Sequence, residues 1–245
     1  MFVSHTFVFQ NPDHMFFRLI SFLFPLVFFM ACSQPNKSEP ASSKTSETSE
    51  TSVEEEMTKK KNILFFGNSL TAAHGLDPSD GFVSLIQQRI DSLGLPYKAI
   101  NAGLSGETTA GGRERVDWVL RTPVDIFVLE LGGNDALRGL DPAAAKENLE
   151  AIILSVKEKN PAVKIILAGM QAPPNLGERY TSAFRNMYPE LAKKHGTALI
   201  PFFLKDVAGI PDLNQRDRIH PNEKGQHFLV ENVWTVLEKE VRNEE

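Results

Sequence analysis

Short apolar runs alternate with longer amphipathic segments from about residue 61 to the end of the chain. Runs of five to eight mostly apolar residues, rich in β-branched and aromatic types, are typical of buried β-strands. They occur at residues 62–66, 97–102, 124–131, 163–169 and 198–202. Segments with apolar residues every three or four positions predict helices with one buried face. These segments are residues 79–93, 108–120, 142–159, 178–195 and about 221–241.

A regular alternation of strands and helices predicts a parallel sheet with helices on both faces. We therefore expect an α/β fold, a three-layer α/β/α sandwich around a five-stranded sheet. Right-handed crossovers leave few topologies, and we favour the flavodoxin-like strand order 2-1-3-4-5. One domain, residues 62–245, accommodates all these elements. Ligands of such sheets bind beyond the carboxyl ends of the strands.

The first 32 residues have a different pattern, typical of an export signal. Arg18 precedes an almost unbroken apolar run, residues 19–31, which is too short for a comfortable membrane span. Met15 is a plausible true start. The run ends at Cys32, the only cysteine of the chain. Residues 1–32 thus predict a signal peptide with a lipobox-like end, with Cys32 as the lipidation site. The alternative is an unmodified thiol.

Residues 33–61 have almost nothing to bury. They contain eleven Ser or Thr, six Glu and five Lys. Such a composition predicts a disordered tether. We therefore expect an exported lipoprotein, periplasmic or on the cell envelope, anchored to a membrane at Cys32. The formal net charge of −5 gives no basic footprint, so nucleic acid is not an expected partner.

Candidate chemistry lies in four pieces that follow predicted strands or precede the last helix. Ser69 follows the first strand, Gly106 the second and Asn134 the third, and Asp217 and His220 precede the last helix. In a parallel sheet these pieces converge on one edge. Each alone also fits an ordinary turn or helix start. Together they predict the active site of a serine hydrolase.

The residue types suit nucleophilic catalysis. A serine hydroxyl needs a base to remove its proton, and His220 is the candidate. Asp217, three residues earlier, can reach the imidazole Nδ1–H and stabilise the cation that forms. The backbone N–H groups of Ser69 and Gly106, with the Asn134 amide, can form an oxyanion hole.

Other noticeable side chains receive structural interpretations. His195 lies where basic residues favour a helix C-terminus, and His74 and His227 have no carboxylate at a diagnostic spacing. We expect Trp118 and Trp234 in the core. No His, Asp or Glu cluster has metal-ligand spacing, so neither a metal nor a cofactor is expected.

The order of Ser, Gly, Asn and Asp-x-x-His resembles the SGNH hydrolases, also called the GDSL esterase/lipase family. Within it, the chain is similar to bacterial esterases of the thioesterase-I, lysophospholipase and arylesterase type. The resemblance covers residues 62–241 and extends beyond the minimal motifs. Its longer stretches are residues 101–108, 130–140, 179–180, 188–189, 200–203 and 219–222.

The resemblance implies a serine esterase that forms an acyl-serine on Ser69 and acts on small acyl esters, thioesters or lysophospholipids. It also assigns substrate contacts to the segment after the fourth strand: Gln171, Ala172, Pro173, Pro174, Asn175 and Leu176. Three alternatives remain: a carbohydrate O-acetylesterase, a non-catalytic binding lipoprotein, and a flavin-binding protein of flavodoxin type. The last leaves Asp217 and His220 unexplained.

One position departs from the family pattern. The motif that names the family has aspartate before the serine, and this chain has Asn68. Asparagine keeps an acceptor that can brace the turn but loses the negative charge. We expect activity to survive, because the family assigns proton transfer to other residues.

Overall fold

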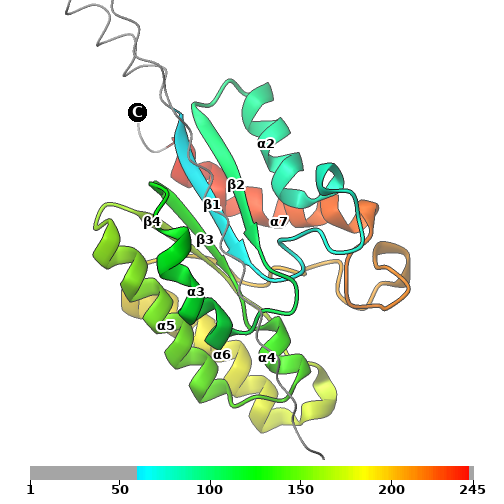
Figure 1. Ribbon diagram of the computed structural model, residues 1–245. Helices are drawn as coiled ribbons and strands as arrows, with labels where there is room; N and C mark the ends of the chain where they lie inside the picture. The colour runs from blue at the N-terminus through cyan, green and yellow to red at the C-terminus, as the bar shows by residue number, and fades with distance from the viewer. Residues whose placement is uncertain (1–59, 243–245) are drawn as a thin grey trace, which may run out of the picture. The chain divides into compact units, whose positions relative to one another are not determined.

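The computed structural model describes residues 60–242, which form a parallel sheet and the helices around it (Figure 1). The strands are β1 (Lys61–Gly67), β2 (Tyr97–Gly103), β3 (Ile126–Glu130), β4 (Lys164–Ala168) and β5 (Ala198–Ile200). The helices are α2 (Phe82–Ser92), α3 (Thr109–Val119), α4 (Gly133–Leu137), α5 (Pro142–Lys159), α6 (Glu178–His195) and α7 (Glu223–Arg242). Single 3-10 turns occur at Pro78–Asp80, Pro174–Leu176 and Pro211–Leu213.

The strand order is β2-β1-β3-β4-β5, and every neighbouring pair is parallel. This confirms the predicted α/β fold and its topology. The register pairs Gly67 at the end of β1 with Gly103 of β2 and Glu130 of β3. The carboxyl ends of β1, β2 and β3 are therefore level with one another, and the loops that follow them start side by side.

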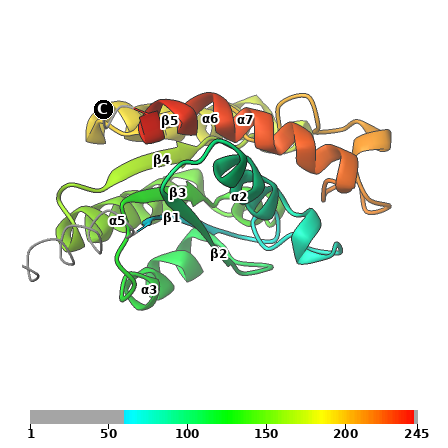
Figure 2. The ribbon, with the colours of Figure 1, turned by 90° about the horizontal axis from the view of Figure 1, so that it is seen from above.

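The helices cover both faces of the sheet in a three-layer arrangement. Helices α3, α5 and α6 pack in sequence on one face, and α2 and α7 pack together on the other (Figures 1 and 2). This division follows from right-handed crossovers, because the chain changes direction across the sheet once, between β2 and β3.

Strand β3 is buried along its whole length, as its continuous apolar sequence predicts. Its side chains meet those of β1 in the core; the rings of Phe66 and Phe127 lie 5.5 Å apart. Each fully buried side chain of this size contributes about 1.5–3 kcal/mol relative to exposure. The core thus fixes the strand ends that carry the loops.

Element boundaries differ from the prediction at a few places. No helix was predicted directly after the third strand, but Gly132, with φ of 114°, precedes a short helix there, α4. The segment before Phe82 forms a 3-10 turn capped by Asp77 instead of the first turn of α2. Strand β5 stops at Ile200 because Pro201 has no N–H to donate. Strand β1 starts at Lys61, the last residue of the predicted tether.

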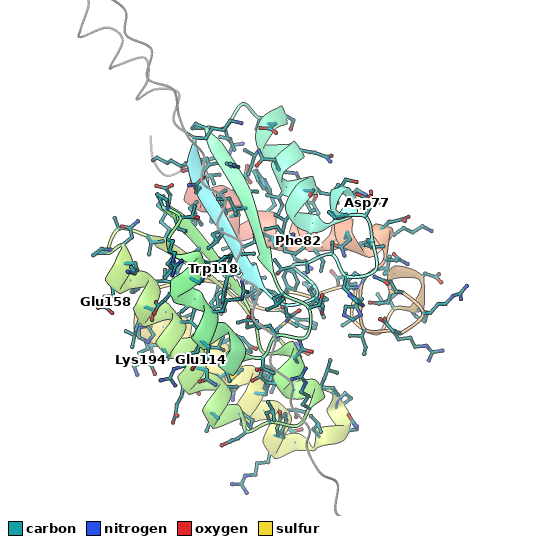
Figure 3. All side chains as sticks on the ribbon, viewed as in Figure 1. Asp77, Phe82, Glu114, Trp118, Glu158 and Lys194 are labelled. Carbon is teal, nitrogen blue, oxygen red and sulfur yellow. The ribbon has the colours of Figure 1, made fainter. Side chains whose placement is uncertain are left out.

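The two tryptophans differ in burial. Trp234 on α7 is 7% exposed, as predicted, with the Arg89 guanidinium 5.3 Å from its ring centre. The prediction for Trp118 was wrong: it is 63% exposed and projects from the outer side of α3 (Figure 3). The apolar stripe of α3 that faces the sheet is made by other residues, Gly112, Val116 and Val119.

The predicted signal peptide, Cys32 and nearly all of the predicted tether lie outside the described residues. Within residues 60–242, no helix is both long and apolar enough to cross a membrane.

Candidate active site

Ser69 lies in the tight turn that follows β1, and Gly67 makes this turn possible. A Cβ atom at residue 67 would collide with Oγ1 of Thr71 and with Glu130, so only glycine fits. In the same turn, Oδ1 of Asn68 accepts a hydrogen bond from the backbone N–H of Leu70 at 3.0 Å. The turn leaves the Ser69 side chain half-buried at the carboxyl edge of the sheet.

His220 connects Ser69 to Asp217, as predicted. The imidazole Nε2 lies 2.9 Å from Oγ of Ser69, and Nδ1 lies 2.6 Å from Oδ2 of Asp217. Oδ1 of Asp217 accepts the backbone N–H groups of Ile219 and His220 at 2.9 and 3.1 Å. Arg218, with φ of 59°, gives the chain the sharp local turn that folds the carboxylate back onto the ring.

Gln215 ties the segment of His220 to the segment that follows Ser69. Its backbone N–H donates to the carbonyl oxygen of His220 at 2.7 Å, and its side-chain amide donates to the carbonyl oxygen of His74 at 2.7 Å. The backbone N–H of His74 in turn donates to the carbonyl oxygen of Ser69. The two halves of the site are thus joined by hydrogen bonds across 151 residues of sequence.

The Asp217 carboxylate is ionised over the whole neutral range. Partial burial alone would raise its pKa, but hydrogen bonds from the His220 ring and from the Ile219 and His220 N–H groups lower it to about 2. An ionised Asp217 must accept its hydrogen bond from Nδ1–H of His220. Nε2 of neutral His220 is then free to accept the Ser69 proton.

Among the described residues, each of the three predicted oxyanion-hole donors has a free N–H. Within residues 60–242, the backbone N–H groups of Ser69 and Gly106 make no hydrogen bond. Nδ2 of Asn134 uses one hydrogen on the carbonyl oxygen of Glu107, at 3.0 Å, which leaves the other free. Gly106 has a φ of 83°, and its carbonyl oxygen accepts from Nη2 of Arg138 at 3.0 Å. These contacts fix the predicted donors on neighbouring loops.

A mostly apolar cavity of about 760 Å³ opens beside Ser69. Ser69, Asn134 and His220 line it, whereas Gly106 and Asp217 do not. Gln171, Ala172, Pro173 and Pro174 of the predicted substrate segment also line the cavity; Asn175 and Leu176 do not and lie in the following 3-10 turn.

The prediction missed several cavity residues that follow β4 and β5. They are Met170, Phe202, Leu204, Ala208, Gly209, Asn214, Arg218 and Ile219, together with Leu70 and Leu137 near the strand ends of β1 and β3. The signal for Met170 and Phe202 was their place directly beyond a strand end. Nothing in the sequence marks Ala208 or Gly209, which lie in an irregular loop.

His195 takes a structural role, as predicted, though with a partner that sequence alone did not indicate. Its Nε2 lies 2.8 Å from Oε1 of Glu150, which joins α6 to α5. Residues 60–242 hold no group of three or more His, Cys, Asp or Glu side chains placed to bind a metal ion.

The fold and this site define a class of protein: an α/β/α serine hydrolase whose Asp and His come from one short segment. Residues 65–228 match the GDSL-like Lipase/Acylhydrolase family, so the chain belongs to that family. It is therefore a serine hydrolase of ester bonds.

Named relatives agree with this class. The chain is 43% identical over 176 residues to "Esterase TesA" of Pseudomonas aeruginosa, covering 71% of this chain and 87% of the relative. It is 35% identical over 170 residues to "Thioesterase 1/protease 1/lysophospholipase L1" of Escherichia coli, covering 69% and 79% of the two chains. A crystal structure of TesA superposes with a TM-score of 0.69 at 42% identity, covering 72% and 98%.

Proposed function

We propose that Ser69 is the nucleophile of a two-step acyl transfer. Its Oγ attacks the carbonyl carbon of an ester or thioester while Nε2 of His220 takes the hydroxyl proton. The tetrahedral oxyanion accepts hydrogen bonds from Ser69, Gly106 and Asn134, each worth about 3–4 kcal/mol in comparable sites. His220 then gives its proton to the leaving alcohol or thiol, and an acyl-serine remains.

Water completes the cycle. His220 removes a proton from a water molecule, which attacks the acyl-serine carbonyl, and the proton then returns to Oγ of Ser69 as the carboxylic acid leaves. Asp217 holds the ring in one tautomer and stabilises the imidazolium in both steps. One observation carries the proposal: the continuous chain of hydrogen bonds from Ser69 through His220 to Asp217, at 2.9 and 2.6 Å, beside an apolar cavity.

The cavity supports acyl substrates with an alkyl chain. Its apolar lining and its volume of about 760 Å³ suit a hydrocarbon more than a sugar, which needs many polar partners. Relatives named as an esterase and as a thioesterase and lysophospholipase support the same substrate class. We do not favour the carbohydrate acetylesterase alternative.

Replacement of the nucleophile tests the function. Ser69→Ala should abolish hydrolysis of p-nitrophenyl octanoate, an acyl-CoA and a lysophosphatidylcholine, with a wild-type circular dichroism spectrum and melting temperature. Undiminished turnover in this variant would contradict the proposal. A preference for the acetyl ester over the octanoyl ester in the wild type would contradict the assignment of the cavity.

We further propose that Cys32 is acylated and that the protein is an exported lipoprotein of the cell envelope. The support is the apolar run that ends in Ala31 and Cys32, followed by the polar segment 33–59. An alkyne fatty acid fed to expressing bacteria should label the wild type and not Cys32→Ala, and the variant should leave the membrane fraction. Equal labelling of both proteins, or no labelling of either, would contradict this proposal.

A further inference from the structure

Glu130 is a buried carboxylate that the acyl-transfer steps do not use. It ends β3 beside the nucleophile turn and is 1% exposed. Within residues 60–242 it forms no ion pair with a basic side chain. All its partners belong to the turn that carries Ser69. Oε1 accepts from Nδ2 of Asn68 at 2.8 Å, and Oε2 accepts from the backbone N–H of Asn68 at 3.2 Å and from Oγ1 of Thr71 at 2.8 Å.

Asn68 connects Glu130 to the nucleophile through its side-chain amide. The side chain of Asn68 is 2% exposed and uses both ends of its amide. Nδ2 donates to Glu130, while Oδ1 accepts from the N–H of Leu70 at 3.0 Å and lies 3.4 Å from Oγ of Ser69. A donor is needed on the Glu130 side and an acceptor on the Ser69 side, and an asparagine amide supplies both.

We propose that Glu130 is a positioning residue for Ser69 that acts through Asn68, because the side-chain amide at position 68 donates to the Glu130 carboxyl group. Glu130 holds Asn68 and Thr71, which lie before and after Ser69 in the turn. With aspartate at position 68, two carboxylates would face each other across the same contact, and one of them would have to hold a proton. The inference rests on the proposed role of Ser69.

The titratable groups around Glu130 are few. Burial raises its pKa to about 7 against the hydrogen bonds from Thr71 and Asn68. From α6, buried Tyr188 faces it; burial and then the charges of Asp135 and Glu130 raise the pKa of this phenol, which is therefore neutral. On α4, Asp135 is engaged by the N–H and the hydroxyl of Thr109 at 2.9 and 2.6 Å. None of these groups supplies a positive charge to Glu130.

A double variant that exchanges the hydrogen-bond donor and acceptor between positions 68 and 130 tests this proposal. In Glu130→Gln, one end of the introduced amide is a donor, whereas the turn offers donors to both ends. Either orientation of this amide leaves its NH₂ group facing an N–H group of Asn68, its side-chain amide or its backbone. Combining Glu130→Gln with Asn68→Asp reverses the direction of the central hydrogen bond, because the amide introduced on β3 then donates to the carboxylate introduced in the turn. The oxygen of the introduced amide still accepts from the backbone N–H of residue 68 and from Thr71.

The kinetics of three variants follow from this geometry. At pH 8, where the Glu130 carboxyl group is ionised, Glu130→Gln should lower kcat about 10- to 100-fold with KM within about 3-fold, because a misplaced nucleophile affects the reaction more than substrate binding. The double variant should recover kcat to within about 3-fold of wild type. Asn68→Asp should stay active at neutral pH. Its activity should fall as pH rises, because the two carboxyl groups at positions 68 and 130 then lose the proton that they share. The pH profiles of the wild type and the double variant should lack this alkaline decrease.

Glu114→Gln, an exposed change of the same type on α3 (Figure 3), is the matched control and should behave as wild type. A Glu130→Gln variant with wild-type kcat would overturn the positioning role, and a double variant no better than Glu130→Gln would overturn the pairing. Should Glu130→Gln fail to fold, the pH profile of Asn68→Asp decides, and a wild-type profile would overturn the proposal. A wild-type enzyme inert towards every ester would instead count against the proposed function.

Discussion

At the scale of single residues, the imidazole of His220 is held from several directions. Asp217 and Ser69 occupy its two nitrogens, and the ring of His74 lies 4.7 Å from its own, tilted by 50°. A ring with both nitrogens engaged has one orientation and, with an ionised Asp217, one tautomer. This is the pre-organisation that general-base catalysis requires.

Replacement of Asp217 tests this arrangement. Asp217→Asn should lower kcat by about 10³- to 10⁴-fold, because the amide no longer enforces the Nδ1–H tautomer. Asp212→Asn, an exposed change in the same loop, should stay within about 2-fold of wild type and serves as the control. Steady-state kinetics on p-nitrophenyl esters measure both. Equal activity of Asp217→Asn and wild type would contradict the assigned role.

The three residues of the proposed triad, which the structure brings together, could be selected from sequence, whereas the residues that support them could not. Ser69, Asp217 and His220 belong to residue types with few alternatives and lie at recognisable spacings. Glu130 lies in residues 130–140, which resemble the family as a whole, but its burial and its contacts with Asn68 depend on strand register. Register is a tertiary property, fixed by the packing of β1 against β3.

At the scale of elements, each functional group is placed by a strand end or a short turn. Ser69 follows β1, the Gly106 loop follows β2, and Asn134 lies in α4 directly after β3. Short helix α4 turns the Asn134 amide towards the Gly106 loop, where it donates to the carbonyl oxygen of Glu107. Sequence indicated the convergence, because parallel strands end at one edge. It did not indicate α4, because two consecutive glycines more often mark a loop.

The two tryptophans provide a test at this scale. Trp234→Ala on α7 should lower the free energy of unfolding by about 3–5 kcal/mol, the usual loss for a buried aromatic side chain. Trp118→Ala on α3 should change it by less than about 0.5 kcal/mol, since its side chain is mostly exposed. Urea titrations followed by circular dichroism measure both values. Equal losses in the two variants would contradict the packing of these helices.

Helix boundaries were predicted well where a capping residue was visible in the sequence. Helix α5 starts after Asp141, whose side chain caps the N–H of Ala143 at 3.0 Å, and α6 ends at Gly196 in the left-handed conformation. The predicted burial of Trp118 was wrong because it was assigned to the core by its residue type alone. The apolar stripe of α3, not its largest side chain, determines which face is buried.

At the scale of the whole molecule, the described chain begins at the amino ends of the strands, and the candidate active site lies at their carboxyl ends. The described chain enters at the amino end of β1, and Ser69 follows its carboxyl end (Figure 1). The seven residues of β1 span about 23 Å at the usual rise of a strand. The described chain therefore begins at the end of the sheet away from the cavity.

Two carboxyl groups give the folded domain opposite dependences on pH. The pKa of Glu130 is raised from 4.5 to about 7, so the folded state binds its proton more tightly and stability falls as pH rises through that window. The pKa of Asp217 is lowered from 3.8 to about 2, so its contribution is present above pH 4 and is lost as pH falls towards 2.

The Glu130 effect can be isolated by comparing two pH values. The destabilisation caused by Glu130→Gln should be smaller at pH 8 than at pH 5, by about 3 kcal/mol, the equivalent of the raised pKa. Urea unfolding of wild type and variant at both pH values measures this difference. A destabilisation independent of pH would show that Glu130 titrates at its ordinary pKa in the folded protein.

The most direct measurement for the whole account is the site of covalent modification by a fluorophosphonate ester. The reagent needs an activated serine and an oxyanion hole, so peptide mass spectrometry should find the adduct on Ser69, with loss of ester hydrolysis in step with labelling. His220→Ala should label far more slowly. An unlabelled enzyme that still hydrolyses esters, or an adduct on another residue that accompanies inactivation, would contradict the assignment of this site.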